Sequence, residues 1–179
     1  MRTIFISDRQ FEIYLTSEQI EIAISRIAGQ INEDFSSRDP IFIGVLNGSF
    51  IFCADLLKKV QIPCQVSFVR LNSYSGIKST GNVSETLNLD KRIEGKHVII
   101  LEDIIETGNT MRFLIDQLNS LQPASISVAC LLMKEEYQVH HEDKIDYIGF
   151  NIPDKFVVGY GLDFEGYGRN FPHIYQLID

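Results

Sequence analysis

The stretch V-I-I-L-E-D-I-I-E-T-G-N-T, from Val98 to Thr110, contains the features that decide the fold of this chain. Four β-favouring apolar residues lead to two adjacent acids, and after two isoleucines comes a turn that opens an amphipathic helix. The pattern predicts a strand over 96–101 and a helix over 111–121. Adjacent carboxylates at the end of a buried strand repel each other, so Glu102 and Asp103 indicate a hydroxyl-rich or cationic ligand.

The turn after these acids has the composition of an anion-binding loop. Gly108 adopts conformations that other residues avoid, and the hydroxyls of Thr107 and Thr110 lie beside it in the sequence. Free backbone N–H groups at the start of a helix can therefore surround an anion such as phosphate. An ordinary helix start uses the same residues, so the two interpretations are compatible. We expect one short loop that can hold a polyol and a phosphate together.

The rest of the chain alternates strand patterns with helix patterns. Thr16 and Gln19 form a capping-box pattern that begins a helix over 17–35. An apolar run over 41–46 predicts a strand buried on both faces, and a helix over 50–60 follows it. Further strands are expected at 65–71, 85–89, 125–133 and 145–150, and the polar segment 73–84 is expected to form a lid. This order predicts an α/β fold with a mainly parallel twisted sheet and helices on both faces.

Composition excludes several classes of protein. With 179 residues and 45% hydrophobic content, the sequence predicts a single domain over 1–179. The net charge of −8 argues against a nucleic-acid partner, and no apolar run reaches the length of a membrane span. Cys53, Cys64 and Cys130 are odd in number and lie in apolar stretches, which is typical of buried thiols in a reducing compartment. With no signal peptide recognised, we expect a cytoplasmic protein.

The loop after the acidic pair resembles the ribose-phosphate signature of the type I phosphoribosyltransferases, which bind 5-phosphoribosyl-1-pyrophosphate. Further along the chain, Leu46-Asn47-Gly48, Ser73-Tyr74, the run 129–134 and the run 152–160 followed by Asp163 and Arg169 look like the hypoxanthine-guanine enzymes of that family. The resemblance extends from about residue 10 to the end. It implies the type I phosphoribosyltransferase fold with a small hood from the terminal segments, and a homodimer or homotetramer.

The same resemblance implies a purine salvage reaction that joins hypoxanthine, and also guanine, to phosphoribosyl pyrophosphate with Mg²⁺ as cofactor. Glu106 is the implied catalytic residue, which assists proton transfer at purine N7. The residues implied for ribose and 5′-phosphate are Glu102, Asp103, Ile104, Ile105, Thr107, Gly108, Asn109 and Thr110, those for pyrophosphate are Leu46, Asn47, Gly48, Ser73, Tyr74 and Arg169, those for the purine are Lys134, Phe156, Val157 and Asp163, and those for the metal are Glu102, Asp103 and Asp163.

Residue chemistry supports the purine assignments but leaves an alternative for each. Lys134 is a donor that suits the O6 acceptor of a 6-oxopurine and disfavours the exocyclic amine of adenine, although a strand-end lysine can simply pair with Glu135 and Glu136. Phe156 can stack on a purine face, although an aromatic residue in such a run is more often core. Asp163 and Arg169 are weak signals individually.

Two residues depart from the pattern of the family. Glu106 stands where the relatives usually have Asp, and it can also be a helix-initiating acid. Asn47 stands where they usually have Lys, in a loop whose peptide is often cis. These departures leave open a non-catalytic sensor of phosphoribosyl pyrophosphate or nucleotides, and the base could instead be xanthine.

Overall fold

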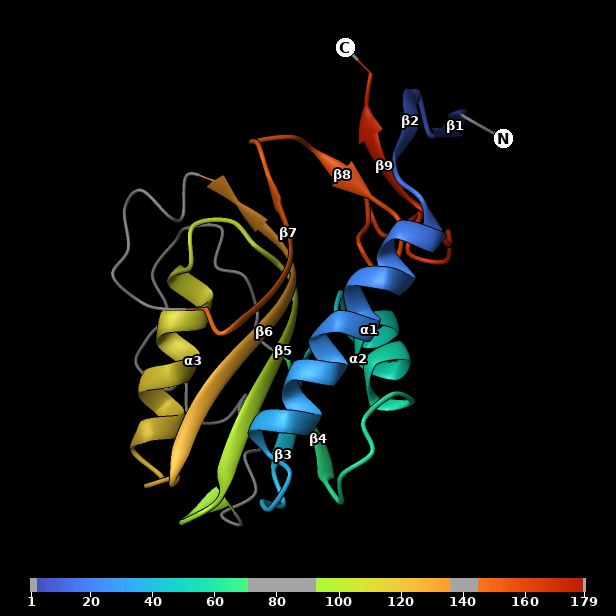
Figure 1. The fold of residues 1–179 in the computed structure, drawn as a ribbon. Helices are drawn as coiled ribbons and strands as arrows, with labels where there is room; N and C mark the ends of the chain where they lie inside the picture. Colours follow the sequence, from blue (N-terminus) through green and yellow to red (C-terminus); the bar gives the residue numbers. More distant parts are fainter. Residues whose placement is uncertain (1–2, 71–92, 136–144, 179) are drawn as a thin grey trace, which may run out of the picture.

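A parallel sheet forms the centre of the computed structural model, which describes residues 3–70, 93–135 and 145–178 (Figure 1). Helices α1 (Ser17–Asp34) and α2 (Phe50–Leu57) cover one face, and α3 (Asn109–Asn119) covers the other. The predicted α/β architecture is confirmed. The strands follow one another across the sheet in the order β4 (Gln65–Arg70), β3 (Ile41–Leu46), β5 (His97–Ile105), β6 (Ser125–Lys134) and β7 (Tyr147–Ile152).

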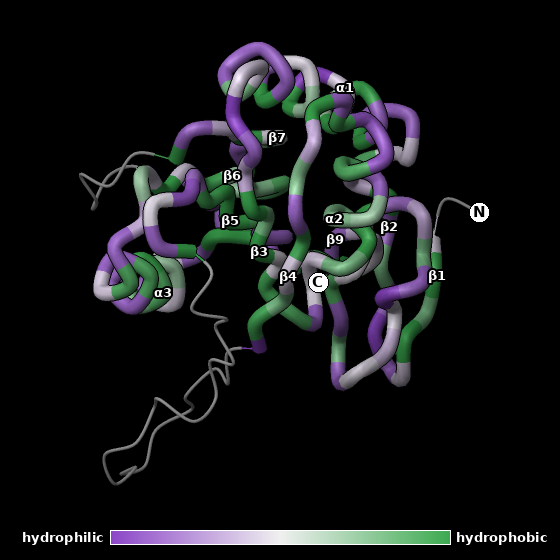
Figure 2. Tube along the Cα trace, turned by 90° about the horizontal axis from the view of Figure 1, so that it is seen from below, coloured by the Kyte–Doolittle hydropathy of each residue, from purple (hydrophilic) through white to green (hydrophobic). Residues whose placement is uncertain are grey.

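Both faces of the sheet are apolar because its strands are covered on both sides. Phe42 and Leu101 pack with Ile24 of α1, whereas Ile43 and Ile100 pack with Leu114 of α3. Figure 2 shows this hydrophobic layer between the helices. Full burial of one such side chain contributes about 1.5–3 kcal/mol, so the two layers account for much of the driving force for folding.

A smaller antiparallel sheet is made from the two ends of the chain. Its strands lie in the order β1 (Thr3–Ile6), β2 (Arg9–Leu15), β9 (Ile174–Leu177) and β8 (Val157–Val158). The expected hood is therefore confirmed, although the sequence patterns did not reveal its N-terminal strands. The hydroxyl of Tyr160 donates a hydrogen bond of 2.5 Å to Asp55 Oδ2 on α2, which ties the hood to the central sheet.

Several boundaries differ from their predictions. Strand β5 runs on to Ile105, because its backbone stays paired with β6 through Ile105 and Met133. Helix α2 ends at Leu57 instead of residue 60, because Asn32 of α1 binds the backbone of Lys59 and Gln61 and holds the next turn out of the helix.

The remaining differences are small. Helix α3 begins two residues early, directly after Gly108, and β7 is displaced toward Ile152, since its pairing with β6 starts only at Tyr147. Cys53 and Cys130 are buried as expected, but Cys64 is exposed, because it lies just before the edge strand β4. The expected lid over 73–84 and strand over 85–89 lie outside the described residues. No helix in the described ranges is long and apolar enough to cross a membrane.

The capping box at the start of α1 gives a stability prediction. The Thr16 hydroxyl accepts from the Gln19 backbone at 3.3 Å, and the Gln19 side chain accepts from the Thr16 backbone at 2.9 Å. We expect Thr16→Ala to lower the free energy of unfolding by about 1 kcal/mol in urea titrations. Thr16→Ser keeps the hydroxyl and should retain most of that stability. Equal losses in both variants would contradict the capping role.

Candidate functional site

Several of the predicted site residues lie at the carboxyl ends of β3 and β5. Numbered along the chain, the parallel strands have the spatial order 2-1-3-4-5, whose direction of winding reverses between β3 and β5. Pairing between these two strands ends at Gly44 and Leu101, and beyond that point β5 continues beside β6 alone. Glu102 and Asp103 therefore lie inside β5 rather than after it, just beyond the last residues that pair β5 with β3. Open α/β sheets bind their ligands at such a switch point.

The two carboxyl groups at this point are buried. Glu102 is 9% exposed and Asp103 is 7% exposed. Burial, followed by the neighbouring Asp103 carboxyl, raises the pKa of Glu102 well above its ordinary 4.5, and burial also raises the pKa of Asp103. Within the described residues neither acid forms a salt bridge. These two carboxyl groups are therefore poorly solvated and are not held in a salt bridge by any described cation.

The loop after β3 touches the acidic pair. The peptide between Leu46 and Asn47 is cis. A Cβ on Gly48 would lie 1.7 Å from Asp103 Oδ2, and a Cβ on Gly161 would lie 2.0 Å from the Gly48 carbonyl. Gly161 also has a φ of 103°, so the hood approaches the β3 loop through a backbone that favours glycine.

Arg169 and Asp163 extend this group into the hood. Arg169 Nη1 donates to the Gly161 carbonyl at 2.6 Å, and Nη2 lies 2.5 Å from Asp163 Oδ1. The other oxygen of Asp163 accepts from the Gly166 backbone at 2.7 Å. The arginine charge also opposes the upward shift in the pKa of Asp103. Fold contacts thus bring together Gly48, Asp103, Asp163 and Arg169, which are far apart in the sequence.

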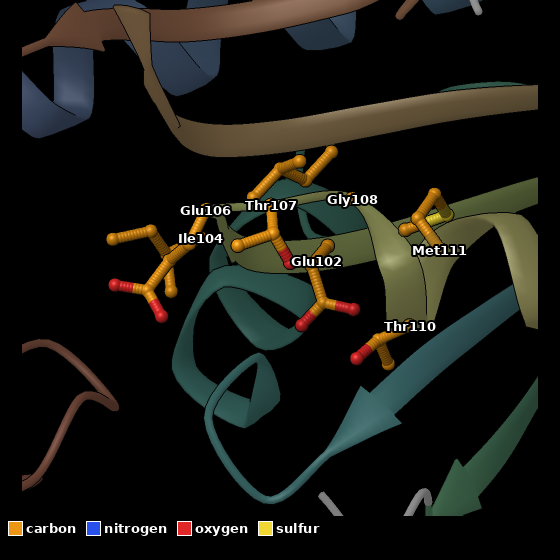
Figure 3. Close-up of a pocket in the computed structure, with 8 residues that line it drawn as sticks. Glu102, Ile104, Glu106, Thr107, Gly108, Thr110 and Met111 are labelled. Atoms are coloured by element: carbon orange, nitrogen blue, oxygen red, sulfur yellow. The ribbon is translucent and has the colours of Figure 1, made fainter. Parts of the chain in front are cut away.

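A cavity of about 130 Å³ that Glu102 helps to line lies over the loop between β5 and α3 (Figure 3). Gly108 precedes α3 as its N-cap residue with a φ of 72°, and within the described ranges no side-chain cap hydrogen bond forms at this helix start. The oxygens of Glu102, Glu106 and Thr110 point to the same side of the loop (Figure 3). Uncapped N–H groups at a helix start attract anions. The lining residues are Glu102, Ile104, Ile105, Glu106, Thr107, Gly108, Thr110 and Met111.

Lys134, at the end of β6, pairs with two acids that come from other elements. Its Nζ lies 2.5 Å from Glu106 Oε1 and 2.7 Å from Asp154 Oδ1. Burial lowers the pKa of Lys134, but the hydrogen bonds and charges of Asp154 and Glu106 outweigh burial, so the pKa is raised. Glu135, one of the two neighbours that the sequence suggested, is not among these partners, and the other, Glu136, lies outside the described residues. Sequence reasoning missed Asp154, and its place two residues before Phe156 was the available signal.

The aromatic residue expected at the purine lies at the edge of the hood. Phe156 is 48% exposed and its ring packs edge to face against Phe164, with centroids 5.7 Å apart. Val157 is buried in β8, where it pairs with Gln176. Ser73 and Tyr74 lie outside the described residues.

Comparison with known proteins identifies the class to which this fold and site belong. The model of the phosphoribosyl transferase domain matches residues 10–165. The hypoxanthine-guanine phosphoribosyltransferase of Aquifex aeolicus is 37% identical over 176 residues, which are 97% of this chain and 98% of that protein. The hypoxanthine-guanine-xanthine phosphoribosyltransferase of Tritrichomonas foetus is 36% identical over 162 residues, 90% of this chain and 88% of that protein.

A solved structure agrees with these sequence matches. The crystal structure of a hypoxanthine-guanine phosphoribosyltransferase from Bacillus anthracis superimposes with a TM-score of 0.83 at 34% identity, covering 93% of this chain and 98% of that one. The chain therefore belongs to the phosphoribosyltransferase family, in the branch of the hypoxanthine-guanine enzymes.

The raised pKa of Glu102 gives a prediction about stability and pH. Above about pH 4.5 the unfolded chain releases this proton whereas the folded chain retains it, so the contribution of Glu102 to stability falls as pH rises. We expect Glu102→Gln to gain stability relative to the wild type as pH rises above about 4.5, measured by urea unfolding. Glu33→Gln, at an exposed acid of α1, controls for loss of one charge. A Glu102→Gln difference that stays constant with pH would contradict the prediction.

Proposed function

We propose that this protein transfers the phosphoribosyl group from 5-phosphoribosyl-1-pyrophosphate to hypoxanthine, and also to guanine, and releases pyrophosphate. The observation that carries the proposal is the pair formed by Lys134 and Glu106, whose charged atoms are 2.5 Å apart. A 6-oxopurine presents O6 and N7 side by side on one edge. An ammonium donor for O6 and a carboxylate for an N7 proton therefore suit that edge when they are adjacent.

The proposed reaction uses the protein mainly for positioning and electrostatics. The N9 atom of the purine forms a bond to C1′ of the ribose while the bond from C1′ to the pyrophosphate oxygen breaks. The proton on N7 passes to the carboxylate of Glu106, and Lys134 holds O6. Phe156 stacks on the purine face, and the backbone of Val157 contacts its edge.

The switch point is the proposed site for the sugar and the anions. The carboxyl groups of Glu102 and Asp103 accept the ribose hydroxyls, and the uncapped start of α3 with Thr107 and Thr110 receives the 5′-phosphate. Leu46, Asn47, Gly48 and Arg169 are assigned to pyrophosphate. Asn47 offers amide hydrogen bonds rather than the lysine charge of relatives, so we expect Arg169 to be the main cation for pyrophosphate among the described residues.

The acidic pair also fits Mg²⁺, which prefers carboxylate oxygens and usually keeps substrate phosphates as further ligands. Both acids are buried and their pKa values are raised, which is the state expected of ligands that release protons when a cation binds. Glu102 and Asp103 would hold the ion, which would supply positive charge against the negative charge that develops on the leaving pyrophosphate. Asp163 is assigned to a second metal position near the purine end of the substrate.

Two alternatives to this reaction are a non-catalytic sensor and an enzyme that prefers xanthine. A non-catalytic sensor is not favoured, because the relatives found are named as transferases and the Lys134–Glu106 pair is present. A xanthine preference is the second candidate, because one relative carries xanthine in its name. The homodimer or homotetramer and the cytoplasmic location stay predictions, and light scattering of the purified protein tests the first of them.

We expect the purified protein to form nucleotide from hypoxanthine and guanine with phosphoribosyl pyrophosphate and Mg²⁺, and none from adenine. The reason is that the Lys134 donor would face the exocyclic amine of adenine and leave both groups unpaired. Lys134→Gln keeps a donor without the charge and should narrow the ratio of kcat/KM for hypoxanthine over adenine. Comparable wild-type turnover of adenine would contradict the O6 assignment, and turnover of xanthine alone would favour the second candidate.

Glu106 gives a separate prediction about the chemical step. Glu106→Gln preserves size but cannot take the N7 proton, so we expect kcat to fall by roughly 10²–10⁴-fold with little change in the affinity for phosphoribosyl pyrophosphate. Glu106→Asp keeps the carboxylate and should stay active. Wild-type turnover by Glu106→Gln would show that this residue only initiates the helix.

A further inference from the structure

The ammonium group of Lys134 pairs with two carboxylates, of which Glu106 is assigned to proton transfer and Asp154 is not. The lysine side chain is 13% exposed, whereas those of Glu106 and Asp154 are 57% and 62% exposed. Two of its three N–H donors can serve these acids, which leaves one for an acceptor on a ligand. The position of this single remaining donor therefore depends on the two contacts that fix the ammonium.

The two acids reach Lys134 from different parts of the fold. Glu106 follows β5 in the loop before α3, whereas Asp154 lies in the turn between β7 and β8. Lys134 on β6 lies opposite Ile152 on β7, and Asp154 is two residues beyond Ile152 in the chain. A backbone hydrogen bond of 2.8 Å from Lys155 to the Pro153 carbonyl shapes this turn. The turn is thus built to return Asp154 to the end of β6.

The proposed reaction changes the charge of only one of these acids. When Glu106 receives the N7 proton it becomes neutral and no longer balances the ammonium of Lys134. Asp154 has no part in that transfer and keeps its charge. We propose, on the basis of the function above, that Asp154 is a positioning residue that holds the Lys134 ammonium for O6 throughout turnover.

Electrostatics agree with this geometry. Without the two acids, burial would favour the neutral amine, because transfer of a charge away from water is unfavourable. Asp154 and Glu106 together raise the pKa of Lys134 despite that burial. A charged donor rejects the amine of adenine more strongly than a neutral one, so Asp154 contributes to base selection through the lysine.

The test is a double-mutant cycle on nucleotide formation, with hypoxanthine and phosphoribosyl pyrophosphate varied in turn. We expect Asp154→Asn to raise KM for hypoxanthine by about 5- to 20-fold, a range moderated by the solvent exposure of the acid. KM for phosphoribosyl pyrophosphate should stay unchanged, and kcat should change by less than about 3-fold. Asp154→Glu keeps the charge and should recover most of the affinity.

Repeating the Asp154→Asn change in the Lys134→Gln variant separates positioning of the lysine from a general disturbance of the turn that carries Phe156. In Lys134→Gln, a further Asp154→Asn change should have no added effect on KM for hypoxanthine, since the residue acts through the lysine. Asp39 is an exposed acid just before the first residue of β3, at the end of that strand away from the site. Asp39→Asn is therefore the matched control and should behave as the wild type.

Several outcomes would overturn the inference. Equal effects of Asp154→Asn with and without Lys134 would show that the acid acts independently of the lysine. A wild-type KM for hypoxanthine in Asp154→Asn would overturn the positioning role while leaving the proposed function intact. A wild-type protein that forms no nucleotide from any purine would overturn both.

Discussion

Burial of the adjacent carboxyl groups of Glu102 and Asp103 is the constraint on which the rest of the site depends. The pair lies where β5 has lost β3 as a neighbour, and burial raises the pKa of both acids. Gly48 has to be a glycine because Asp103 occupies the space of its Cβ, and Gly161 has to approach Gly48 in the same way. The hood, the β3 loop and the acidic pair therefore pack together as one unit. The buried carboxyl groups lower the stability of this unit and are kept for ligand binding.

The purine end of the site is organised around a different balance of charge. At the acidic pair, described cations make no salt bridge, whereas Lys134 has two carboxylate partners at 2.5 and 2.7 Å. Buried carboxyl groups without a salt bridge suit hydroxyls and a divalent cation, whereas an ammonium held by two carboxylates suits the carbonyl oxygen of an uncharged purine. The acids inside β5 are thus assigned to the sugar phosphate, whereas Glu106 after β5 and Lys134 at the end of β6 together are assigned to the base.

Local patterns predicted the parts of this structure that depend on neighbours in sequence. The apolar run at Ile41–Leu46, the capping box at Thr16 and the turn at Gly108 are all found as predicted. Patterns could not show that β5 continues beside β6, since that extension depends on pairing with a strand about 28 residues further on. Asp154 was missed as a partner of Lys134 because this contact also joins segments that are distant in the sequence. The terminal strands were implied by family resemblance rather than by their own composition. Cys64 was wrongly expected to be buried, because an apolar neighbourhood does not reveal an edge strand.

The central claim is that the acidic pair at the switch point exists to bind the sugar and cation end of phosphoribosyl pyrophosphate. Calorimetric titration of the wild type and of Asp103→Asn with this ligand, in the presence and absence of Mg²⁺, tests it most directly. We expect the wild type to bind in a Mg²⁺-dependent manner and Asp103→Asn to lose about 10-fold or more in affinity, since a charged hydrogen-bonding group is removed. Equal affinity in the two proteins, or wild-type binding that ignores Mg²⁺, would contradict it.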